Sequence, residues 1–231
     1  MNISSNLSSF NLYNSNNSLN KNNKFNETLK ENSNTIVNIP DEYDKNNDGK
    51  WDIKPLTVSV SCASDFRIAY KAYKTDEYPK IIVEIVDENS NNVTFREYID
   101  PTNLDLENIS YAEAVAYSAY MYEEGKFDAL ESIMFTDLIK RDAYPEFYEE
   151  GKPYTKEILE KISTGRFNLK NGLKNALSLM FEQGDLTGYY LHSNLGKLVF
   201  KYENSDFYNN SKNNINNSKQ NNTNKVPYVL I

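Results

Sequence analysis

The hydrophobic pattern has a period of two in the first half of the chain, which is typical of β-strands. Residues 57–63 (TVSVSCA) alternate between apolar and polar side chains and predict a half-buried strand. Residues 80–87 and 93–98 predict two more strands, and the turn formers between them predict a hairpin. Residues 66–74 alternate like a strand but contain enough alanine for a short helix, so both interpretations stay open.

The period changes to about 3.6 after residue 100, which predicts helices. Two capping boxes, in which a Ser or Asp precedes a Glu by three residues, predict helices over 110–124 and from 128 to about 141. Further helices are predicted over 155–163 and 168–183. Alternation returns over 186–202, around the turn sequence SNLG, and predicts a second hairpin.

The apolar positions also predict which faces are buried. The alternation of the first strand places Val58, Val60 and Cys62 on its inward face, where Cys62 would be a small core hydrophobe. The second helix has an apolar stripe that is predicted to face inward: Leu130, Ile133, Met134, Leu138 and Ile139.

These elements predict an α+β fold, with a small antiparallel sheet packed against three or four helices. Residues 1–38 and 204–231 are rich in Asn, Ser and Lys and are predicted to be disordered tails around a single domain at 39–203. The apolar end of the chain, VPYVLI, is predicted either to fray or to add a strand to a sheet edge, of this chain or of a partner.

The charge of the chain argues against two classes of partner. Thirty-three acids and 25 bases give a net charge of -8, which disfavours binding to nucleic acid or to an anionic membrane surface. No apolar run approaches the roughly 20 residues of a membrane span, and no secretory signal is visible, so we expect no membrane insertion. The start, MNISSNLSSFNLYNSNNS, resembles type III secretion substrates, which leaves a cytoplasmic location and non-Sec export open.

One stretch carries a recognisable chemical pattern. Oxygen-bearing side chains recur at every second position in Asp44, Asn46 and Asp48, Gly49 follows, and Asp52 comes three residues later. The pattern resembles the calcium loops of EF-hand and dockerin proteins. The resemblance implies ligands from Asp44, Asn46, Asp48, the Lys50 carbonyl and Asp52.

The resemblance is incomplete at the twelfth position of the loop. Pro55 stands where the family has a bidentate acid, so weak calcium binding is expected. Asp41 and Glu42 are alternative ligands from upstream. The other interpretation is a turn rich in Asn, Asp and Gly that needs no ion.

No catalytic motif is visible. His192 is the sole histidine, which excludes a histidine-rich zinc site. The sequence therefore favours a bacterial binding protein with a protein partner, exported or not, and leaves its oligomeric state open. Two alternatives remain: a hydrolase of polysaccharide or peptide that uses acids between Pro145 and Pro153, and a cytoplasmic adaptor linked to export.

Overall fold

Four consecutive strands form an antiparallel meander. The computed structural model describes residues 37–63, 66–144 and 154–201. Its strands pair in the order β1-β2-β3-β4, with these bounds: β1 Thr57–Cys62, β2 Arg67–Lys74, β3 Ile81–Asp87 and β4 Asn92–Ile99. The three predicted strands are confirmed, and the ambiguous segment is a strand.

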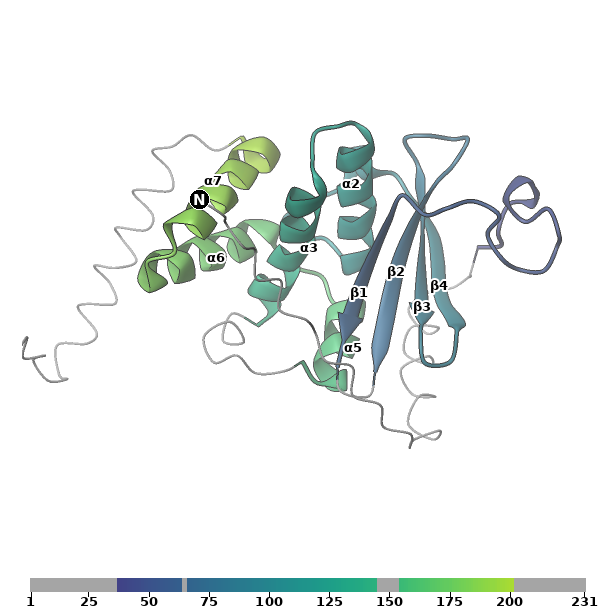
Figure 1. Ribbon diagram of the computed structural model, residues 1–231, viewed down its shortest axis with the longest axis horizontal. Coiled ribbons are helices and arrows are strands. Elements are labelled where there is room, and N and C mark those ends of the chain that lie inside the picture. Colours follow the sequence, from purple (N-terminus) through teal and green to yellow (C-terminus); the bar gives the residue numbers. More distant parts are fainter. Residues whose placement is uncertain (1–36, 64–65, 145–153, 202–231) are drawn as a thin grey trace, which may run out of the picture.

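The helices pack on one face of this sheet, and the segment that precedes β1 lies away from them (Figure 1). The α-helices of the described residues are α2 Tyr111–Glu123, α3 Ala129–Ala143, α5 Lys156–Thr164, α6 Leu169–Gln183 and α7 Leu186–Phe200. Two short 3-10 helices are η1 Asp41–Tyr43 and η2 Pro101–Asn103. The arrangement confirms the predicted α+β fold.

Both predicted capping boxes are present. Ser110 accepts a hydrogen bond from the backbone N–H of Glu113, whose carboxylate accepts from the Ser110 N–H in return. Asp128 and Glu131 repeat this exchange at the start of α3. Because only five residues separate α2 from α3, the two helices form an antiparallel pair.

The core lies between the sheet and the helices. The strands contribute one face of side chains, and α2, α3 and α6 contribute most of the rest. Its largest fully buried members are Tyr70, Tyr111, Phe66, Phe135, Ile68, Ile81, Ile85, Ile109, Leu138 and Ile139.

The predicted second hairpin is wrong, because its residues belong to α7. Asp185 caps the helix through the backbone N–H of Gly188, directly after α6 has ended at Gly184 in the left-handed conformation. His192 therefore lies in a helix, with Nδ1 3.0 Å from the Gly188 carbonyl. Alternation over only six or seven residues is compatible with a helix as well as with a strand. Here the helix cap at Asp185 favours the helix.

The predicted inward face of β1 is also wrong. Val58 and Val60 are 50% and 38% exposed and Cys62 is exposed, whereas Ser61 is buried. On the inward face, the Ser59 hydroxyl is hydrogen-bonded to the hydroxyl of Tyr111 at 3.0 Å, whereas the buried Ser61 hydroxyl has no partner among the described residues. Thus apolar side chains lie on the solvent face of an edge strand.

The apolar stripe of α3 is only partly buried. Met134, Leu138 and Ile139 pack in the core as predicted, but Leu130 and Ile133 are 47% and 66% exposed. Both exposed residues lie in the first half of α3. No helix within the described ranges combines the length and the apolar character that a membrane span requires.

Candidate functional site

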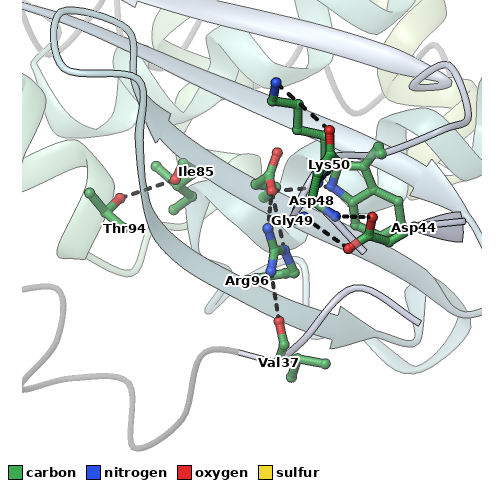
Figure 2. A network of polar contacts seen from close by, with 10 residues as sticks. Val37, Asp44, Asp48, Gly49, Lys50, Ile85, Thr94 and Arg96 are labelled. Carbon is green, nitrogen blue, oxygen red and sulfur yellow. Dashed lines mark hydrogen bonds and ion pairs between the residues drawn. The ribbon is translucent and has the colours of Figure 1, made fainter. Parts of the chain in front are cut away.

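The calcium-like loop is closed by hydrogen bonds between its own residues. The Asp44 carboxylate accepts from the backbone N–H groups of Asp48 at 3.0 Å and Gly49 at 2.9 Å, as Figure 2 shows. The Asp52 carboxylate accepts from the Lys45 N–H at 2.6 Å. Gly49 adopts a φ of 75°, which glycine reaches without strain. The predicted tight reversal is therefore present.

The five predicted ligands are only partly gathered. Asp44 and Asp52 both turn into the loop, and the Asn46 amide donates to Asp52 at 3.4 Å. Asp48 instead accepts from the Lys50 N–H and pairs with the Lys50 ammonium at 3.8 Å. The residues described in the structure contain no group of three or more His, Cys, Asp or Glu side chains arranged to hold a metal ion.

The loop is anchored to the sheet by Trp51, a contact that sequence reasoning missed. Its indole ring stacks on Tyr73, with centroids 4.1 Å apart, and its Nε1–H donates to Glu84 at 3.1 Å. Glu84 also accepts from the guanidinium of Arg96, and both side chains are buried. The loop thus covers a buried ion pair on the sheet face away from the helices.

The two edges of the sheet differ. The edge at β4 is covered by the chain before η1: the Val37 N–H donates to the Arg96 carbonyl at 3.3 Å, and Arg96 Nη1 donates to the Val37 carbonyl at 3.0 Å (Figure 2). The edge at β1 pairs with no strand in the described part of the chain. It also lacks the Lys, Pro or bulge that protects many edge strands.

The pairing of β1 with β2 determines which backbone groups reach the open edge. The Ala63 N–H donates to the Phe66 carbonyl at 2.7 Å, and antiparallel residues alternate between facing the partner strand and facing away. Residues 57, 59 and 61 therefore pair with β2. Val58, Val60 and Cys62 turn their N–H and C=O groups outward.

A pocket of about 440 Å³ lies beside this edge, between β1, α2 and α3. In Figure 1 both helices stand next to β1, the first strand of the sheet. One end of the pocket is mostly apolar and is lined by Leu56, Val115, Tyr122, Ala129 and Ile133. Its volume falls in the range of roughly 300 to 1,000 Å³ that is usual for ligand sites.

The other end of the pocket is polar. The antiparallel arrangement of α2 and α3 brings Tyr111, near the start of α2, close to Lys140, near the end of α3. Ser59, Thr136 and Asp137 complete this end. Burial disfavours the charged form of Lys140, but the nearby groups Tyr111, Asp137, Tyr154 and Cys62 together raise its pKa above the usual value. The ammonium is therefore positively charged at neutral pH.

His192 lies apart from this pocket and is buried. Burial lowers its pKa, so the imidazole is neutral at pH 7, and its Nε2 has no hydrogen-bond partner within the described residues. The acids between Pro145 and Pro153, VPYVLI and the predicted tails, apart from Val37 and Asn38, lie outside the described residues. Comparison of the chain with protein families, curated proteins and solved structures found no match.

Proposed function

We propose that this protein is a binding protein that takes an extended segment of a protein partner along the β1 edge. The observation that carries the proposal is the combination of an open strand edge with a pocket directly beside it. Three residues offer outward N–H and C=O groups, which an added strand would pair with.

The side chains around the edge suit an added strand on both of its faces. Alternate side chains of a strand point to opposite sides. Those on the helix side would enter the pocket near Ile133, while those on the other side would lie beside Val58 and Val60, both substantially exposed. Burying these apolar groups contributes about 25 cal/mol for each Å² removed from water.

A test starts from a displayed library of random peptides selected on the full chain. We expect Val60→Pro to weaken the binding of selected peptides at least tenfold, because proline removes an outward N–H. Val60→Thr, which keeps that N–H, is the matched control. Isothermal titration calorimetry measures the affinities, and circular dichroism verifies the fold.

Two results would overturn this function. One is a library that yields no peptide binder for the full chain. The other is a set of binders whose affinities are the same for Val60→Pro and the native chain. N-methylation of alternate peptide amides is an independent test, because it should weaken binding only at the amides that pair with β1.

Calcium binding by the loop is a second proposal, supported by Asp44 and Asp52 turning into one loop. Because Pro55 occupies the twelfth position, we expect saturation only at calcium concentrations on the order of a millimolar. Trp51 lies within the loop and reports binding through its fluorescence. The response should disappear in the double variant Asp44→Ala with Asp48→Ala. A native chain that does not respond to millimolar calcium removes the metal proposal.

A further inference from the structure

We propose that the peptide bound at the β1 edge carries an acidic side chain that pairs with the Lys140 ammonium. This inference rests on the proposed function and specifies the chemistry of the partner. It predicts a segment that is apolar at one inward position and acidic at another.

The first support is the position of Lys140. The side chain lines the polar end of the pocket, and its ammonium lies 5.5 Å from the centre of the Tyr154 ring. It makes no ion pair with any acid of the described residues, whereas Lys74 and Lys170 pair with Glu123 and Glu107. A partly buried cation that no carboxylate of the described residues pairs with gains from an incoming anion, because the pocket screens charges less than water does.

The nearest acid of the pocket is already engaged. Asp137 accepts from Arg141 Nε at 3.0 Å, one helical turn along α3. That guanidinium offsets part of the repulsion between Asp137 and a carboxylate arriving at Lys140, while Asp137 still favours the ammonium form of Lys140. The hydroxyls of Ser59 and Tyr111, 3.0 Å apart, add polar groups at the same end.

The spacing along α3 limits where the acid stands in the peptide. Ile133 and Lys140 are seven residues apart, which corresponds to about 10 Å along a helix. Inward-facing residues of a strand recur about every 7 Å. An apolar residue over Ile133 and an acid that reaches Lys140 are therefore two or four positions apart in the peptide.

The experiment uses peptides selected on the full chain and made with amidated ends, so that a carboxylate comes only from a side chain. We expect an enriched Asp or Glu two or four positions from an apolar residue. Replacing that acid by its amide should weaken binding about tenfold or more, and Lys140→Gln should do the same. In the Lys140→Gln chain, replacing the acid of the peptide by its amide should have no further effect on the affinity.

Lys174→Gln, on the exposed side of α6, is the matched control and should leave the affinity unchanged. Peptides that bind at the β1 edge without an acid preference, or acids that matter equally in Lys140→Gln, overturn this inference while the proposed function stands. A peptide that binds more tightly with a free C-terminal carboxylate than with an amidated end, and equally well without its side-chain acid, also overturns it. A library without binders contradicts the proposed function itself.

Discussion

Arg96→Met is expected to lower the free energy of unfolding by about 3 to 5 kcal/mol, the usual cost of removing one partner from a buried ion pair. Glu84 and Arg96 have side chains only 5% and 8% exposed. Without the guanidinium, the Glu84 carboxylate keeps the Trp51 indole as a donor but loses its opposite charge. Urea unfolding followed by circular dichroism and by Trp51 emission measures the change.

The same substitution should loosen the calcium-like loop. Arg96 lies over the Trp51 ring at 5.7 Å and also binds the Val37 carbonyl, so it joins the loop and the preceding segment to the sheet. We expect the native-state emission of Trp51 to shift toward the red as the ring gains contact with water.

A double variant separates the ion pair from general packing. Replacing Glu84 and Arg96 together by methionine removes both charges, and apolar replacements of a buried pair are often neutral. The double variant should therefore recover most of the free energy of unfolding that Arg96→Met loses. It should stay about 1 kcal/mol below the native chain, because the Trp51 N–H loses Glu84 as its acceptor. A double variant as unstable as the single one would show that packing, rather than unpaired charge, dominates.

The parts of the fold that follow from local chemistry were predictable from the sequence. The capping boxes at Ser110 and Asp128 place two helix starts because each side chain satisfies an N–H within its own turn. The strands β3 and β4 follow from β-branched residues around a turn-rich segment. None of these elements depends on a residue far away in the chain.

The predictions from sequence were wrong where a distant part of the chain or a helix cap determines the local structure. Ser59 faces inward, where Tyr111, 52 positions away, is its hydrogen-bond partner, and alternation alone gives no sign of which face the helices cover. The segment after Gly184 alternates, yet Asp185 begins a helix. In both cases the apolar pattern alone predicted the wrong structure.

The proposed site could not be found from the sequence for the same reason. Its walls come from β1, α2 and α3, and a pocket between them requires the position of α3 beside the edge strand. Lys140 reads in the sequence as an ordinary charge near a helix end. Ile133 gives no sequence signal either, because the apolar stripe of α3 predicts that it is buried and only the structure shows that it is exposed beside the pocket.

Gly172→Ala is expected to destabilise the protein by roughly 3 kcal/mol, at the upper end of the usual cost of overpacking. A Cβ at this position would lie 2.0 Å from the carbonyl oxygen of Leu138, a backbone atom of α3. Neither helix can relieve the overlap by a side-chain rotation, so α3 and α6 must move apart.

The sign of this change is the decisive measurement. In a helix without close neighbours, alanine is more favourable than glycine by about 1 kcal/mol, so Gly172→Ala would stabilise the protein if the approach to Leu138 were unimportant. Lys174→Ala, on the exposed side of the same helix, is the control and should change stability by less than about 0.5 kcal/mol. Because α3 also forms one wall of the pocket, its displacement should weaken peptide binding at the β1 edge together with stability. A stabilised Gly172→Ala variant would refute the tight packing of α3 on α6 that positions that wall.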